Sequence, residues 1–143
     1  MLKISTKGRY AIEALLYIAS YSDGKAIKLK QIKENTKISE KYLEQILYTL
    51  RKENIITTVR GAKGGYYIAQ SLDELTVGKV LRAMEGELVP VACVSNPGSC
   101  VSDAKNDCLT RSLWVQMSNT IDEFVDSITL QELKDEFLGG KFI

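Results

Sequence analysis

The chain has 143 residues and a formal net charge of +1, with 45% hydrophobic and 26% charged residues. This length suffices for one domain with its own core, or for a small domain with an extension. Histidine is absent, which excludes Cys–His and Ser–His catalysis and any metal site that needs imidazole. There is no bilayer-spanning apolar run, and the N-terminal stretch contains Glu13 and no clear cleavage site, so the sequence predicts a cytoplasmic protein without a membrane partner.

Charge is distributed unevenly along the chain. Residues 1–63 contain thirteen Lys and Arg against six Asp and Glu, a balance of +7, whereas residues 64–143 contain six against twelve, a balance of −6. A basic front half is typical of proteins that meet a polyanion such as DNA. A solvated charge pattern is the plainer alternative.

The first expected helix covers residues 6–21, with a broad apolar face and Ser5 or Thr6 as its N-cap. Lys7 and Arg9 fall in its first turn, where the helix dipole favours acidic residues. A phosphate docked at this end would explain the two cations, since the N-terminus of a helix binds anions. The alternative is that both side chains are merely solvent-exposed.

Two short helices with a three-residue connection follow, one over about residues 29–35 and one that begins after Ser39. Apolar residues of the second helix recur at i, i+3, i+4 and i+7: Leu43, Ile46, Leu47 and Leu50. This is the spacing of a helix-turn-helix, in which the second helix reads the major groove with its N-terminal residues. The candidate DNA contacts are Ser39, which also suits the N-cap position, and Lys41, Tyr42, Glu44 and Gln45.

Two of these side chains suit base readout. Glutamine can pair with adenine, and glutamate can accept a hydrogen bond from cytosine N4. Phosphates repel Glu44 unless a base donor compensates, so this residue can act as a specificity filter. Its alternative role is a contact within the helix, with Lys41 or neighbours of Tyr48.

The pattern then changes to a β-hairpin. Residues 55–60 are rich in β-branched side chains, residues 66–69 form the returning strand, and glycines punctuate the turn between them. Arg60 and Lys63 flank this turn, and an arginine at such a tip can enter the narrow minor groove. Gly61 and Gly64 would allow close approach of DNA or would serve the geometry of the turn alone, and both roles can hold together. Helix-turn-helix and hairpin together predict a mainly α winged helix-turn-helix fold.

Residues 87–107 follow no regular period and carry most of the cysteines. Cys93, Cys100 and Cys108 are separated by six and then seven residues. In a reducing compartment, three cysteines favour metal or redox chemistry over disulfides. Three thiolates can converge on one ion or cluster, but the spacing lacks Cys-x-x-Cys pairs, so free redox-active thiols stay an alternative.

Three further helices are expected. Thr76 caps one over residues 77–85, a long one spans residues 109–128, and a capping box over residues 129–132 begins a last one that ends near Phe137. The long helix carries an apolar stripe that so small a domain cannot cover, so we expect it to pair with a second copy. The stripe consists of Leu109, Leu113, Met117, Ile121, Phe124, Val125 and Ile128.

These elements divide the chain into three expected parts. Residues 1–86 form the winged helix-turn-helix domain, residues 87–108 form a cysteine-bearing sensor loop, and residues 109–143 contain the dimerisation helix and the C-terminal helix. The order predicts a DNA-reading head joined through a sensor to a dimerising stem.

Several stretches resemble the Rrf-type transcription regulators, and the likeness covers nearly the whole chain. It rests on the motifs STKGRYA, YLEQIL, VRGAKGGY, LTVGKVLRAMEG and CLTRSLW, while the cysteine loop is most similar to the IscR branch. The resemblance implies a homodimeric repressor whose long helices cross and which binds a palindromic operator in double-stranded DNA. It also implies that Glu44, Gln45 and Arg60 occupy DNA-reading positions.

The same likeness implies an iron–sulfur cluster, of the 2Fe–2S type, held by Cys93, Cys100 and Cys108. IscR-like proteins carry a histidine three residues after the last cysteine, and Arg111 occupies that position here. The fourth ligand is therefore open to a small thiol, a residue of the partner subunit or a carboxylate, the last being Asp103, Asp107 or Glu87. A weak fourth ligand implies a labile cluster that can be lost on purification.

The resemblance also allows a regulator that binds no metal. In the CymR-like branch, which regulates cysteine and sulfur metabolism, a cluster-free protein would respond to thiol oxidation or to a protein partner. A cysteine-dependent enzyme is disfavoured by the absence of histidine and of a phosphate-cradling loop. A helix-turn-helix that binds protein in place of DNA is disfavoured by the basic front half.

Overall fold

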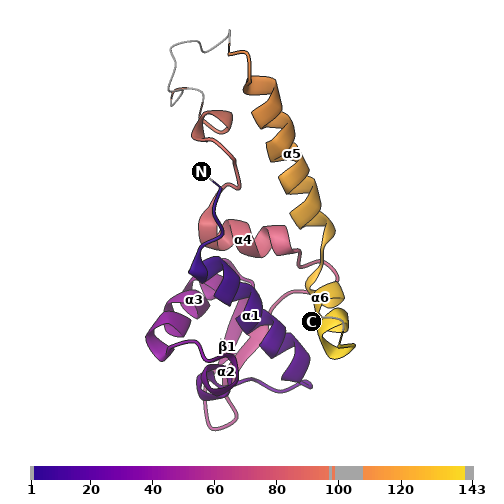
Figure 1. The fold of residues 1–143 in the computed structure, drawn as a ribbon. Helices are drawn as coiled ribbons and strands as arrows, with labels where there is room; N and C mark the ends of the chain where they lie inside the picture. The colour runs from indigo at the N-terminus through magenta and orange to yellow at the C-terminus, as the bar shows by residue number, and fades with distance from the viewer. Residues whose placement is uncertain (1, 97, 99–107, 141–143) are drawn as a thin grey trace.

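The computed structural model of the chain describes residues 2–96, 98 and 108–140 (Figure 1). Its elements are α1 (Thr6–Tyr21), α2 (Leu29–Thr36), α3 (Glu40–Lys52), β1 (Ile56–Val59), β2 (Gly65–Ile68), α4 (Val77–Glu85), the short 3-10 helix η1 (Ala92–Val94), α5 (Arg111–Ser127) and α6 (Leu130–Leu138). The strands form one antiparallel hairpin, the wing. The predicted fold class is confirmed.

Helices α1 to α4 and the wing form the head. Figure 1 shows that α5 extends beyond the head, past α4, next to the segment that carries η1. Helix α6 then returns to pack beside α1. The backbone N–H of Leu130 donates to the carbonyl of Leu75 at 2.8 Å, which fixes the return.

The core of the head lies between α1, α2, α3 and the wing. It contains the apolar face predicted for α3, together with α1 residues at helical spacing. Burial of each such leucine or isoleucine contributes about 1.5–3 kcal/mol. The fully buried members on these two helices are Ala11, Ala14, Leu15, Ile18, Leu43, Ile46, Leu47 and Leu50.

The predicted N-caps begin four of the helices. The side chain of Ser5 accepts from the N–H of Gly8 at the start of α1, and Ser39 and Thr76 cap α3 and α4 in the same way. Thr129 forms a full capping box at the start of α6. Each cap satisfies a backbone N–H that has no partner within its helix, a contribution of about 1 kcal/mol.

The apolar stripe predicted on α5 has one part that is buried within the chain and one part that is exposed. Val125 is buried and Ile121 is half-buried, and both pack in a second small core with Leu81 and Leu88. The head thus covers one portion of the stripe within the same chain, and the predicted pairing concerns the portion that stays exposed. Four side chains stay exposed, with exposed fractions of 97% for Leu109, 50% for Leu113, 41% for Met117 and 64% for Phe124.

Glu85 fastens the end of α4 to the start of α1. Its carboxylate Oε1 accepts hydrogen bonds from the N–H of Ser5 at 2.9 Å and from the hydroxyl of Ser5 at 2.5 Å. Gly8 is buried beneath this carboxylate, and a Cβ at Gly8 would overlap Glu85 Oε1. The contact therefore requires glycine in the first turn of α1.

Replacement of Gly8 with alanine should lower the free energy of unfolding by about 1 kcal/mol. The methyl group displaces the carboxylate of Glu85 from Ser5, a loss that exceeds the gain in helix propensity of about 1 kcal/mol. Urea unfolding measures the change. In a Glu85→Ala background the same substitution should be neutral or stabilising, and equal destabilisation in both backgrounds would contradict this interpretation.

Candidate nucleic-acid interface and cysteine site

The exposed side of α3 gathers most of the predicted reading residues. Lys41, Glu44 and Gln45 are exposed, and they border one shallow hollow together with Lys7 from the first turn of α1. The buried apolar face of α3 holds it in the head, and an ion pair of 2.9 Å also joins Glu40 to Lys33 of α2. Lys7 thus adds a cation from a second element to the surface of the reading helix.

Tyr42 and Arg9 differ from the other candidates in where they lie. Tyr42 is half-buried and packs edge-on against Tyr10, with ring centroids 5.7 Å apart, so its ring helps to hold α3 against α1. Arg9 borders a different groove, beside Tyr17 and Phe137 of α6. The structure therefore brings Lys7, but not Arg9, to the hollow on α3, because residues two positions apart lie on different sides of a helix.

The wing presents its cations at an exposed tip. Arg60, Gly61 and Lys63 are exposed, whereas Gly64 is buried. The N–H of Gly64 donates to the carbonyl of Gly61 at 2.9 Å, and a Cβ at Gly64 would overlap the carbonyl of Val59. Gly64 therefore serves the geometry of the turn, and its contact with DNA stays a prediction.

Sequence reasoning missed Tyr48 as a candidate contact. Its side chain is 70% exposed and borders the same hollow as Glu44 and Gln45. The signal was present, because residue 48 follows these two by four and three positions and so shares their side of the helix. An exposed aromatic ring beside base-reading polar groups can contact a thymine methyl group or a sugar.

The two described cysteines lie at neighbouring segments. Cys93 is in η1 and Cys108 precedes α5, and both are half-buried. Arg111 Nη1 donates to the carbonyl oxygen of Cys93 at 2.9 Å, so Arg111 connects η1 to the start of α5. Cys100, Asp103 and Asp107 lie outside the described residues, and Glu87 is exposed.

The start of α5 is later than predicted. The chain turns through Cys108 and Leu109, and the helix begins at Arg111, whose N–H bonds to the carbonyl of Cys108 at 3.3 Å. Within the described residues, no three His, Cys, Asp or Glu side chains gather as a metal site. The third predicted ligand, Cys100, lies outside the described residues, and the cluster stays a prediction.

The environment of Cys108 favours its thiolate. The hydroxyl of Thr110 lies 3.6 Å from Cys108 Sγ, and this hydrogen bond is the largest cause that lowers the pKa of the Cys108 thiol. Backbone N–H groups and the positive charge of Arg111 act in the same direction. A thiolate is the form that binds metals and reacts with electrophiles.

We expect Cys108 to react with iodoacetamide down to a lower pH than an ordinary cysteine. Because the folded-state pKa is lowered, the thiolate persists below the usual titration range and is lost only as the pH falls through the lowered value. Mass spectrometry of the metal-free protein gives the alkylation rate against pH. Thr110→Val should shift this profile to higher pH, whereas Thr110→Ser, which keeps the hydroxyl, should not.

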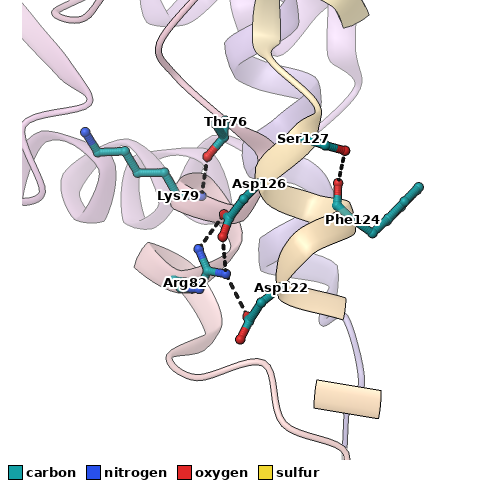
Figure 2. A network of polar contacts seen from close by, with 7 residues as sticks. All are labelled: Thr76, Lys79, Arg82, Asp122, Phe124, Asp126 and Ser127. Carbon is teal, nitrogen blue, oxygen red and sulfur yellow. Dashed lines mark hydrogen bonds and ion pairs between the residues drawn. The ribbon is translucent and has the colours of Figure 1, made fainter. Parts of the chain in front are cut away.

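Arg82 connects α4 to α5 by a bidentate ion pair. Its Nη1 and Nη2 lie 2.7 and 3.0 Å from the two carboxylate oxygens of Asp126, and Nη2 also lies 2.7 Å from Asp122 Oδ1 (Figure 2). Asp126 first and Asp122 second raise the pKa of Arg82, so the guanidinium stays charged at any pH of interest. Together with Glu85, this residue makes α4 the link between α1 and α5.

A double-mutant cycle on Arg82→Met and Asp126→Asn should give a coupling of about 0.5–1 kcal/mol in unfolding. The pair is partly exposed and therefore screened, although its bidentate geometry is favourable. Glu123→Gln, an exposed change on the same turn of α5, is the matched control and should be neutral. Additivity of the two substitutions would show that the contact contributes nothing.

Helix-turn-helix, basic wing and projecting helix define the class: a winged helix-turn-helix DNA-binding protein with a C-terminal helical stem. The Rrf2 family, described as an iron-dependent transcriptional regulator, matches residues 4–136, and the chain belongs to this family. The chain is a transcriptional regulator of IscR-like sequence and not an enzyme. Among the described helices, none combines the length and apolarity needed to cross a membrane.

The similar proteins include regulators named IscR and regulators named CymR. The chain is 37% identical over 132 residues to the transcriptional regulator IscR of Pectobacterium carotovorum, covering 92% of this chain and 79% of that protein. The structure of CymR, the global cysteine regulator of B. subtilis, has a TM-score of 0.79 at 34% identity and covers 94% and 98% of the two chains. IscR of T. potens has a TM-score of 0.78 at 33% identity and covers 99% and 93%.

Proposed function

We propose that this chain is a homodimeric repressor that binds a palindromic operator through α3 and the wing. The observation that carries the proposal is the convergence of Lys7 with Lys41, Glu44 and Gln45 on one exposed surface. A cation beside acceptor and amide groups combines phosphate attraction with base readout. Arg60 at the exposed wing tip adds a side chain suited to the minor groove.

The exposed apolar side chains of α5 support the dimer. Leu113, Met117 and Phe124 lie along a projecting helix with nothing in the described part of the chain to cover them. A patch of this kind on a soluble domain marks an interaction surface, and a second copy offers the same stripe. Pairing would hold two reading helices at a fixed separation, about 34 Å for half-sites one DNA turn apart.

We further propose the three-part organisation of residues 1–86, 87–108 and 109–143, in which the middle part is the sensor. Cys93, Cys100 and Cys108 would hold a 2Fe–2S cluster, which supplies one-electron redox chemistry and sensitivity to oxidants. The described residues fit such a group. Arg111 joins the Cys93 segment to the Cys108 segment, and the lowered pKa of Cys108 favours the thiolate that iron binds.

Arg111 itself is not a ligand in this proposal. A guanidinium stays protonated and has no lone pair to donate, so the fourth ligand comes from elsewhere. Its positive charge instead favours an anionic cluster nearby, and its hydrogen bond orients the backbone of Cys93. A cluster held by three thiolates and a weaker fourth group should be lost readily to oxygen or chelators.

The alternative is a cluster-free regulator that responds to thiol oxidation or to a protein partner. The lowered pKa of Cys108 supports direct thiol chemistry as well as metal binding. The similar structures include Staphylococcus aureus CymR in an oxidized form, with a TM-score of 0.73 at 33% identity, covering 94% of this chain and 97% of that one. In a cluster-free regulator of this kind, oxidation of the cysteine thiols themselves would be the signal.

Anaerobic purification separates the two forms of the proposal. We expect broad visible absorption from sulfide-to-iron charge transfer, with iron and acid-labile sulfide in the protein. Colourless protein that contains neither iron nor sulfide supports the cluster-free regulator. DNA binding with and without the reconstituted cluster then tests the switch. A cluster can change affinity only by its different effect on two states of the dimer, so equal affinity and sequence preference would end the switch hypothesis.

A further inference from the structure

A second basic surface lies beside the turn of the wing, and no residue of the reading helix α3 lines it. Lys25, Lys28 and Lys63 line one hollow of about 400 Å³, whose other lining residues are Tyr67 and small residues. None of the three lysines makes an ion pair with a carboxylate in the described part of the chain, whereas Lys30 pairs with Glu34. The hollow therefore holds three uncompensated positive charges.

The backbone fixes these lysines relative to one another. The segment before α2 pairs with β2 like a third strand, because Ile27 and Tyr66 exchange two N–H···O bonds of 3.0 and 2.8 Å. The approach is close, since a Cβ at Gly65 would lie 2.5 Å from the carbonyl oxygen of Ile27, and Gly65 has a φ of +149°. Lys25 and Lys28 are thereby attached to the wing that carries Lys63.

We infer that this hollow, the wing-side hollow, binds the phosphate backbone of the operator where it borders the minor groove. A wing whose tip enters the minor groove lies between two phosphate chains, because the groove is only about 6 Å wide. Lysines at the side of the wing then meet one of those chains, and Tyr67 adds a hydroxyl donor. The inference rests on the proposed DNA-binding function.

The chemistry of the surface fits a backbone better than a base edge. Lysine ammonium groups form strong contacts with phosphate oxygens from any direction, and such contacts carry no sequence information. Asp23, in the turn before Lys25, is the acid closest to the hollow in sequence and is not among its lining residues. The hollow should therefore strengthen binding to every duplex without changing which operator is preferred.

The test compares Lys25→Gln/Lys28→Gln with the wild-type protein by fluorescence anisotropy. The probes are an operator duplex selected from a random library and a random-sequence duplex of equal length, from 50 to 200 mM KCl. We expect affinity to fall by about tenfold or more on both duplexes at 0.1 M salt. The salt slope should decrease in magnitude by about 0.9 for each lysine, because each lost phosphate contact releases fewer counterions.

Two comparisons make the result specific. Lys30→Gln removes a lysine that lies outside the hollow, with Glu34 3.9 Å away, and should leave both duplexes nearly unaffected. Gln45→Ala should weaken the operator complex alone. Equal unfolding midpoints show that the variants are folded.

The inference is overturned if the lysine double variant keeps the wild-type affinity and slope, or if Lys30→Gln loses as much. Continued binding by the wild-type protein in either case leaves the proposed function intact. Failure of the wild-type protein to bind any duplex removes both.

Discussion

A Met117→Glu variant is expected to be monomeric and to bind its operator about 10²–10⁴-fold more weakly than the wild-type protein. Met117 lies in the middle of the exposed stripe on α5, so pairing of two copies would bury a carboxylate against its symmetry mate. A monomer must bind each half-site separately. It then loses the effective concentration that a linked second head provides.

The control for this variant is Gln116→Glu. Residue 116 is exposed on the same helix and receives the same charge, but it does not belong to the stripe. Sedimentation velocity gives the oligomeric state, and anisotropy with a two-half-site duplex gives the affinity. A Met117→Glu protein that stays dimeric would place the dimer interface elsewhere on the molecule.

Arg60→Ala should lower operator affinity by about 10- to 100-fold, which corresponds to about 1–3 kcal/mol. Arg60 is exposed next to the tip of the wing, and a narrow A·T-rich minor groove carries the strongest negative potential for it to enter. The loss should depend on sequence. Replacing A·T by G·C pairs at the wing position should weaken the wild-type complex and leave the Arg60→Ala complex unchanged.

Arg51→Ala is the matched control for this second prediction. Arg51 is also exposed and cationic, but it lies in the last turn of α3, opposite the end that presents base-reading side chains. Its removal should change affinity by less than about threefold at 0.1 M salt. Equal losses for Arg51→Ala and Arg60→Ala would indicate general electrostatic attraction in place of a wing contact.

The helices could be predicted from the sequence because their signals are local. Ser39, Thr76 and Thr129 each accept a hydrogen bond from an N–H three residues later, so a short stretch of sequence contains both partners. The apolar face of α3 likewise follows from spacing within one helix. These features agree with the tertiary fold, which is why local reasoning succeeded there.

Contacts between distant residues could not be predicted in this way. The bonds that join Glu85 to Ser5 and Arg82 to Asp126 connect residues 80 and 44 positions apart. The attachment of Lys28 to the wing depends on a bridge formed by the preceding residue. The spacing of apolar residues also could not predict that Val125 packs on α4 while Phe124 stays exposed, because both lie at the edge of one stripe.

The central claim is that two copies of this head bind one duplex together. Light scattering of the protein alone, and of its complex with an operator duplex selected from a random library, tests it most directly. We predict a dimer in solution, two chains on each duplex, and an affinity that falls steeply as salt rises. A single-copy protein that leaves every duplex unbound at low ionic strength would contradict the claim.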